Sequence, residues 1–196
     1  MSEQRQSRPP GPAPSAARLQ EAALAHLARF ATTEAGLRRV LARRVDRWAR
    51  AAEQAGEADV APRAAAAKAA IAEIASKLAA AGTVDDVAFA ASRARRLLRT
   101  GRSRRAALAH LAQQGVDAET AAAALPEGAE SELDAAIAFC RRRRIGPFAR
   151  AEADPDARRK ALAALARAGF AHGIAAQALR MDPALAEDRL IALRQG

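Results

Sequence analysis

The sequence is poor in the residues that build sheets, disulfides and membrane spans. It has no tyrosine, one tryptophan, one cysteine, six valines and six isoleucines in 196 residues. With few β-branched and aromatic residues, an extensive sheet has little to build with. The lone Cys140 excludes an internal disulfide and a multi-cysteine zinc site, and it fits a reducing compartment. No uncharged apolar run reaches the roughly 18 residues of a membrane span, so we expect a cytoplasmic protein without a membrane partner.

Alanine and arginine dominate what is present. The chain contains 60 alanines, 29 arginines and only three lysines, and both dominant residues favour helices. The formal net charge is +10, which suggests an anionic partner such as nucleic acid or a protein bound to it. A GC-rich coding sequence also explains arginine in place of lysine, although it does not explain the excess of base over acid. We predict an all-α protein.

Caps and helix-ending glycines divide the chain into short helices. Residues 1–18 are rich in proline and glycine and lack the apolar stretch of a signal peptide, so they are predicted to be a disordered tail. Three helical repeats are predicted at 19–83 (with a polar insert at about 49–62), 84–129 and 130–193. The predicted first helix, 19–30, places Phe30 on its buried face. Pro62 is predicted as a first helical residue, and Ser131 with Asp134 as the start of a later helix.

An internal repeat supports this division. Residues 104–125 and 158–179 are identical at twelve of 22 positions, although alanine inflates that count. Each copy reads as a helix, a glycine turn at Gly115 or Gly169, and a second helix. The predicted architecture is an elongated, right-handed solenoid of three tandem three-helix units.

Catalytic chemistry is not recognisable in this sequence. The histidines His26, His110 and His172 lie far apart, without metal-ligand spacing. Four arginines follow Cys140 and could lower its pKa, but a lone, half-buried cysteine is the better interpretation because no histidine is near in sequence. Phosphate-binding glycine loops are also missing. We therefore expect no enzyme activity, no catalytic residue, no metal and no cofactor.

Basic residues give the strongest functional signal. Seven arginines fall within residues 93–105 without an acid, and Arg141 to Arg144 add four more. Guanidinium groups suit phosphate and carboxylate, which they contact with two hydrogen bonds at once. The candidate partner-binding or DNA-binding surface consists of Arg93, Arg96, Arg99, Arg102, Arg104, Arg105, Arg141, Arg142, Arg158 and Arg159. Sequence-specific readout is not expected, because the helices after Gly115 and Gly169 lack the polar residues that read base edges.

The central region resembles the RecX family of proteins that regulate the recombinase RecA. The resemblance is carried by Gly82-Thr83-Val84-Asp85-Asp86, Phe89-Ala90, a basic run, Gly101, Arg104-Arg105, Leu111, Gly115-Val116 and Leu125. The third repeat is similar through Arg159-Lys160, Leu165, Gly169-Phe170 and Ile174, and the first, more loosely, through Leu24, Leu27, Arg29, Leu37 and Leu41. The family-signature residues with an expected structural role are Gly82, Asp85, Asp86, Phe89, Gly101, Leu111, Gly115, Leu165 and Gly169.

The resemblance implies a curved, all-helical solenoid of three-helix units that binds in the groove of the RecA–DNA filament, and we expect a monomer. There it would oppose the ATPase, recombinase and co-protease activities of RecA, with DNA contacted weakly or within the filament. Two alternatives stay open on the residues alone. The chain could be a basic nucleic-acid-binding accessory protein that acts without RecA, or a helical adaptor whose charge only reflects composition.

Overall fold

The computed structural model describes residues 11–150 and 154–195, and this part of the chain is helical without a strand. The predicted all-α class is confirmed. The helices are α1 (Ala16–Leu27), α2 (Glu34–Gln54), α3 (Val60–Ala80), α4 (Asp86–Arg99), α5 (Arg104–Gln114), α6 (Ala118–Ala123), α7 (Ala129–Arg143), the 3₁₀ helix η1 (Gly146–Phe148), α8 (Pro155–Ala168), α9 (His172–Arg180) and α10 (Pro183–Gln195). Of the helices described, none combines the length and apolarity of a membrane span.

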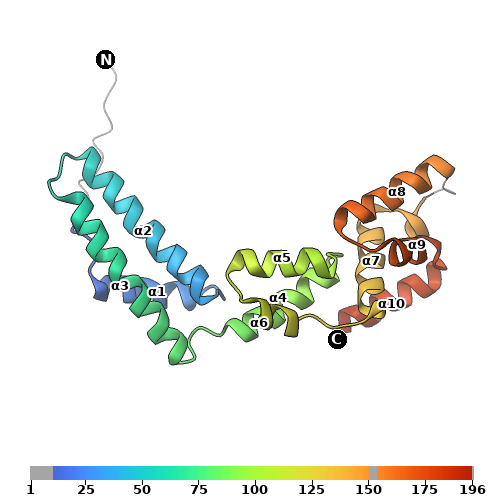
Figure 1. Cartoon of the computed structure of the whole chain (residues 1–196), viewed down its shortest axis with the longest axis horizontal. Helices are drawn as coiled ribbons and strands as arrows, with labels where there is room; N and C mark the ends of the chain where they lie inside the picture. The colour runs from blue at the N-terminus through green and yellow to red at the C-terminus, as the bar shows by residue number, and fades with distance from the viewer. Residues whose placement is uncertain (1–10, 151–153, 196) are drawn as a thin grey trace, which may run out of the picture. The chain divides into compact units, whose positions relative to one another are not determined.

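The chain forms two compact units, residues 1–86 and 87–196, which we call the N-terminal and C-terminal units. In the N-terminal unit the long helices α2 and α3 lie side by side, and α1 packs against both (Figure 1). Leu37, Leu41 and Val45 are fully buried at helical spacing on α2, and Trp48 follows on the same face. This apolar stripe explains why α2 forms and which side of it faces the core.

Several predicted boundaries in the N-terminal unit were wrong. Residues 1–10 of the predicted tail lie outside the described residues, but α1 already begins at Ala16, capped by Ser15. The Nε1–H of Trp48 donates to the carbonyl of Gly11 at 2.8 Å, which ties part of the predicted tail to the core. Phe30 is 53% exposed because α1 ends at Leu27, before it can reach the buried face.

The predicted polar insert is mostly helix. Helix α2 continues to Gln54 and α3 begins at Val60, so only a short turn separates them. Pro62 is the third residue of α3 rather than its first, and at that position its missing N–H still costs no helical hydrogen bond.

The C-terminal unit shows the internal repeat in its geometry. Gly115 and Gly169 end α5 and α8 with φ of 90° and 99°, the left-handed conformation that favours glycine. Leu111 and Leu165, equivalent positions of the two copies, are both completely buried. Ser103, Asp117 and Asp154 cap α5, α6 and α8 as predicted, each accepting a backbone N–H. Helix α7 instead begins at Ala129 after Gly128, without a side-chain cap, so the predicted start at Ser131 and Asp134 was wrong.

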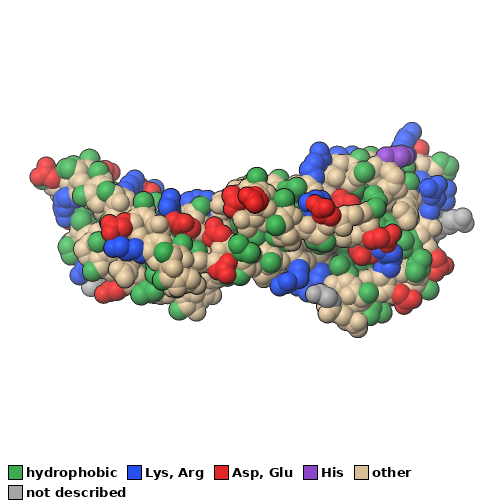
Figure 2. All heavy atoms as spheres, turned by 60° about the horizontal axis from the view of Figure 1, so that its bottom comes forward, with side chains coloured by type: hydrophobic (Ala, Val, Ile, Leu, Met, Phe, Trp, Pro, Cys, Tyr) green, Lys and Arg blue, Asp and Glu red, His purple; other side chains and the backbone are tan. Residues whose placement is uncertain are grey.

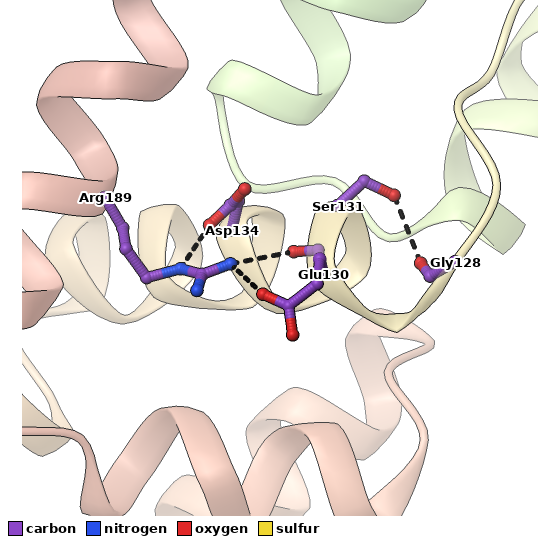
Figure 3. A network of polar contacts seen from close by, with 5 residues as sticks. All are labelled: Gly128, Glu130, Ser131, Asp134 and Arg189. Atoms are coloured by element: carbon purple, nitrogen blue, oxygen red, sulfur yellow. Dashed lines mark hydrogen bonds and ion pairs between the residues drawn. The ribbon is translucent and has the colours of Figure 1, made fainter.

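Four α-helices, α7 to α10, follow the second three-helix segment, where three were predicted. Helix α10 is joined to α7 by Arg189, whose guanidinium contacts the carboxylates of Asp134 and Glu130 at 2.6 Å each (Figure 3). Helix α7 is the centre of this part, with six consecutive residues, 135–140, buried. A helix buried on all sides provides the surface on which the neighbouring turns and helices dock.

Candidate anion-binding groove

The turn between α4 and α5 lies directly against the backbone of α7. Gly101 occupies this turn with φ of +75°, and a Cβ placed there would stand 2.6 Å from Phe139 Cα and closer still to Phe139 N. Only glycine permits such an approach, since it has no side chain and tolerates positive φ. The turn therefore brings Arg102 beside the C-terminal half of α7.

The same turn is also fixed to the C-terminal end of α8. The buried Ser103 hydroxyl donates to the carbonyl of Ala168 at 2.7 Å while it accepts the N–H of Ala106 at 3.2 Å. A Cβ at Gly169 would lie 2.9 Å from Arg105 Nε, so the guanidinium of Arg105 packs over this glycine. The ends of α4, α7 and α8 thus converge.

A groove of about 710 Å³ lies where these three ends meet. It is lined by Gly101, Arg102, Phe139, Arg142, Arg143, Ala164, Arg167 and Ala168. Four of the eight lining residues are arginines, and no acidic residue is among those that the structure describes at its wall. We call Arg102, Arg142, Arg143 and Arg167 the arginine groove. Its chemistry is that of an anion site, since guanidinium binds phosphate or carboxylate with two parallel hydrogen bonds.

Phe139 forms an aromatic wall for two of these arginines. Arg142 and Arg143 follow it by three and four residues on α7, so all three side chains share one helix face. The guanidinium carbons lie 5.5 and 5.7 Å from the ring centroid, within the range of cation–π contact. The ring itself meets Phe170 edge-on at 5.8 Å. Contact with a packed ring restricts the two arginines and lowers the entropy cost of binding an anion.

The structure divides the predicted arginines into distinct groups. Arg102 and Arg142 line the groove, and Arg105 lies beside it at Gly169. Arg158 lines a separate hollow of about 620 Å³, together with Arg150 and Arg180. The exposed side chains of Arg96, Arg99 and Arg159 line neither cavity, and Arg159 pairs with Asp156 at 3.2 Å.

Three other predicted arginines make internal contacts. Arg104 donates to the carbonyls of Leu125 and Pro126 at 2.8 and 3.0 Å. Arg141 pairs with Glu187 of α10 at 2.6 Å and stacks on Phe148. Arg93 donates through Nε to His110 Nε2 at 3.0 Å. These contacts connect neighbouring segments of the C-terminal unit, so the three guanidinium groups have a structural role.

Two groove arginines escaped the prediction. Arg143 belongs to the predicted basic run 141–144 but not to the predicted surface, and Arg167 lies seven residues from the nearest other basic residue of α8, Lys160. The signal that could have found Arg143 is its four-residue spacing from Phe139, which puts both on one helix face. No pattern marks Arg167, because α8 meets α7 only through the tertiary fold. On the face that Figure 2 shows, basic and acidic side chains are interspersed, so the net charge is not a uniform coat.

Burial shifts the pKa of two groups in this unit, Cys140 and His110. Cys140 is fully buried, and burial raises the pKa of its thiol to about 12. The four following arginines therefore do not activate it. Burial, together with the charges of Arg93 and Arg102, lowers the pKa of His110. Among the described residues, no group of three or more His, Cys, Asp or Glu side chains is placed to hold a metal ion.

The family-signature residues lie at turns, caps and core positions. Gly82 follows α3 with φ of +69°. The Asp86 carboxylate accepts the N–H of Glu34 at 2.9 Å and so caps α2 from the start of α4. Phe89 is half-buried against the core of the C-terminal unit, and Asp85 is exposed. The remaining signature residues, Gly101, Leu111, Gly115, Leu165 and Gly169, occupy the positions given above.

Known proteins show what the chain is similar to. Residues 85–125 match the family model of the RecX second three-helix domain. The Regulatory protein RecX of Agrobacterium fabrum (strain C58) is 43% identical over 77 residues, which cover 39% of this chain and 41% of that protein. The Regulatory protein RecX of Myxococcus xanthus (strain DK1622) is 42% identical over 74 residues, covering 36% and 40%. The chain therefore spans about two fifths of the length of these curated relatives.

A solved structure shares the fold. The crystal structure of RecX from Lactobacillus salivarius matches with a TM-score of 0.60 at 17% identity, covering 84% of this chain and 94% of that one. The fold and these matches define an all-helical repeat protein related to regulatory proteins. Residues 85–125 are thus similar to a domain of the RecX family, and the resemblance that the central motifs predicted is confirmed.

Proposed function

We propose that this protein is a negative regulator of RecA that binds the RecA–DNA filament in its groove. It would inhibit the ATPase, recombinase and co-protease activities and so modulate recombination and the SOS response. The sequence relatives support this proposal, since both carry the name Regulatory protein RecX. The observation that carries it is the arginine groove, a preformed cationic site on a helical-repeat scaffold.

The arginine groove suits a filament that presents phosphate and acidic side chains together. Its charges lie on elements fixed by Gly101 and Ser103, so little order is lost when an anion binds. Stacking on bases plays no part in this proposal, because Phe139 is buried and its ring is covered by Arg142 and Arg143. The protein would therefore contact backbone phosphates and carboxylates without reading sequence.

The binding residues of this proposal are Arg102, Arg142, Arg143 and Arg167, with Arg105 beside them. The predicted Arg93, Arg104 and Arg141 are left out, because their guanidinium groups are held by internal partners. The protein would act as a cytoplasmic monomer, without catalysis and without a cofactor.

A second candidate function is supported by the net charge of +10. A basic helical protein can coat nucleic acid without any contribution from RecA. Binding to naked DNA would then fall steeply with salt, as it does for about six or more phosphate contacts.

The test titrates the protein into RecA's single-strand-dependent ATP hydrolysis, from far below to above one molecule per RecA. Binding to naked DNA is measured in the same buffer. We expect inhibition at substoichiometric amounts, at concentrations that leave the DNA mostly bare. Inhibition that begins only when the DNA is saturated would replace this proposal with the coating function. If the protein neither inhibits RecA nor binds DNA, the remaining interpretation is a structural adaptor.

A double substitution that removes two positive charges tests whether inhibition of RecA depends on the arginine groove. In R142Q/R143Q two guanidinium groups of the groove are lost, and we expect inhibition to require about tenfold more protein, corresponding to about 1.4 kcal/mol. The matched control is R18Q/R29Q, which removes the same charge from exposed positions of the N-terminal unit. Arginines also stabilise helix C-termini, so the urea midpoint of each variant is measured. Equal inhibition by both variants, with unchanged stability, would exclude the groove as the binding site.

A further inference from the structure

A second basic surface lies on α2, in the N-terminal unit. Six arginines occur within residues 38–50 of this helix, and all six are exposed. Arg43, Arg47 and Arg50 are spaced by four and three residues, so they form one stripe along the helix. Leu41, Val45 and the other buried residues of α2 face the opposite side, toward α1 and α3. We call Arg43, Arg47 and Arg50 the α2 stripe.

The three arginines of the stripe are in none of the ion pairs of the described residues. Asp46 is the only acid within residues 38–50, and its carboxylate pairs with Lys68 of α3 at 2.6 Å. The ion pairs of the described part of the chain do not include Arg43, Arg47 or Arg50. Like charges three and four residues apart destabilise a helix by about 0.2–0.5 kcal/mol per pair. Asp46 is three residues from Arg43 and four from Arg50, but its carboxylate is held by Lys68, so the stripe keeps a concentrated positive charge.

The helix dipole does not explain the stripe either. Basic residues in the last turn of a helix interact favourably with its negative end, and Arg141 to Arg143 on α7 have this placement. The last turn of α2 contains no basic residue, and the stripe lies in the middle of the helix. Three exposed guanidinium groups in a row are therefore available to an external polyanion.

We infer that the α2 stripe binds the phosphodiester backbone of nucleic acid, independently of the arginine groove. A protein partner would need an apolar or aromatic centre in its interface, yet none of the exposed large hydrophobic residues lies on α2. The stripe spans eight residues, from Arg43 to Arg50, or about 10 Å along the helix axis. Over this length the long, flexible arginine side chains can reach neighbouring phosphates of one strand.

This inference gives the protein two anion sites, one in each compact unit. Two linked sites raise the apparent affinity for a long polyanion, because binding at one raises the local concentration at the other. The inference goes beyond regulation of RecA, since the α2 stripe would engage nucleic acid when RecA is absent.

The test measures binding of the full chain to a fluorescein-labelled oligothymidylate of about 30 nucleotides, by anisotropy, between about 50 and 200 mM NaCl. The variant R43Q/R47Q/R50Q removes the stripe, and glutamine retains helix propensity close to that of arginine. The control R18Q/R29Q/R194Q makes the same change in net charge at exposed positions outside both surfaces. Far-UV circular dichroism checks that each variant keeps its helicity.

Three lost contacts lower the salt slope by about 2, at roughly 0.7 per phosphate of a single strand. The ratio of the affinity at 50 mM NaCl to the affinity at 200 mM NaCl should therefore be about 16-fold smaller for the stripe variant than for the unchanged protein. The control is expected to keep a slope close to that of the unchanged protein. A stripe variant that binds like the control would overturn the inference, including the case in which the stripe binds an acidic protein. The assay contains no RecA, so its result is independent of the ATPase test of the proposed function.

Discussion

Replacement of Gly101 by alanine should destabilise the C-terminal unit strongly. Two separate costs meet at this position. A Cβ in the left-handed conformation costs about 1–2 kcal/mol, partly offset by about 0.4–1 kcal/mol from the reduced freedom of the unfolded chain. The new methyl group also overlaps the backbone of α7, where Phe139 Cα lies 2.6 Å away and Ala138 C 2.9 Å. Because α7 is buried and cannot give way, overpacking adds about 1–3 kcal/mol.

Gly82→Ala separates the two costs. Gly82 has φ of +69°, close to the +75° of Gly101, but no atom lies within 4 Å of a Cβ placed there. We expect a loss of about 1 kcal/mol for Gly82→Ala, the backbone term alone. Gly101→Ala should lose about 2–4 kcal/mol, since it carries both terms. With a urea m-value of about 2 kcal/mol/M, the midpoints fall by about 0.5 M and by 1–2 M.

The chain contains a natural reporter in each unit. Trp48, the only tryptophan, is buried in the N-terminal unit, and the only cysteine, Cys140, is fully buried in the C-terminal unit. Tryptophan fluorescence therefore follows unfolding of the first unit. Thiol labelling follows the second, because the raised pKa and burial of Cys140 protect it until the unit opens.

Gly101→Ala should shift the labelling transition and leave the fluorescence transition in place, whereas Gly82→Ala should shift the fluorescence transition by the smaller amount. The reasoning would be refuted if the two substitutions lowered the midpoints of their own units equally. In that case the α4–α5 turn could move away from α7 without a loss of stability, and its close approach to α7 would not explain why position 101 is glycine.

Two further predictions concern the residues around the groove. The free energy of unfolding of the C-terminal unit should be highest above pH 6.5 and should decrease as the pH falls below that value. The reason is that the pKa of His110 is lower in the folded protein than in the unfolded chain, so the unfolded chain binds the proton first. In His110→Gln, whose amide oxygen can still accept from Arg93, the midpoint followed by circular dichroism should lose this part of its pH dependence; an unchanged pH profile would contradict the assignment. Ser103→Ala should cost about 2–4 kcal/mol, since it removes a helix cap and leaves the carbonyl of Ala168 without its donor. Asp117→Ala, which removes only an exposed cap, should lower the urea midpoint by clearly less. Equal losses in urea unfolding would show that the Ser103–Ala168 hydrogen bond contributes nothing.

The elements that were predicted correctly depend on local sequence. Ser103, Asp117 and Asp154 cap their helices through side chains that reach backbone N–H groups three residues away. Gly115 and Gly169 end helices because they adopt positive φ without strain. The errors at Phe30 and Pro62 are also local, since periodicity locates a helix better than it locates its ends.

Composition, helix caps and spacings of a few residues are enough to predict the helical class, the internal repeat and the RecX resemblance. The contacts of each arginine depend instead on how the helices pack against one another. Consecutive residues on a helix point about 100° apart, so Arg141 turns to Glu187 of α10 while Arg142 and Arg143 face the groove. Arg167 joins them from α8, since Gly101 and Ser103 fasten the α4–α5 turn to two other helices. The sequence shows how many arginines there are, but the group that each one contacts depends on residues dozens of positions away.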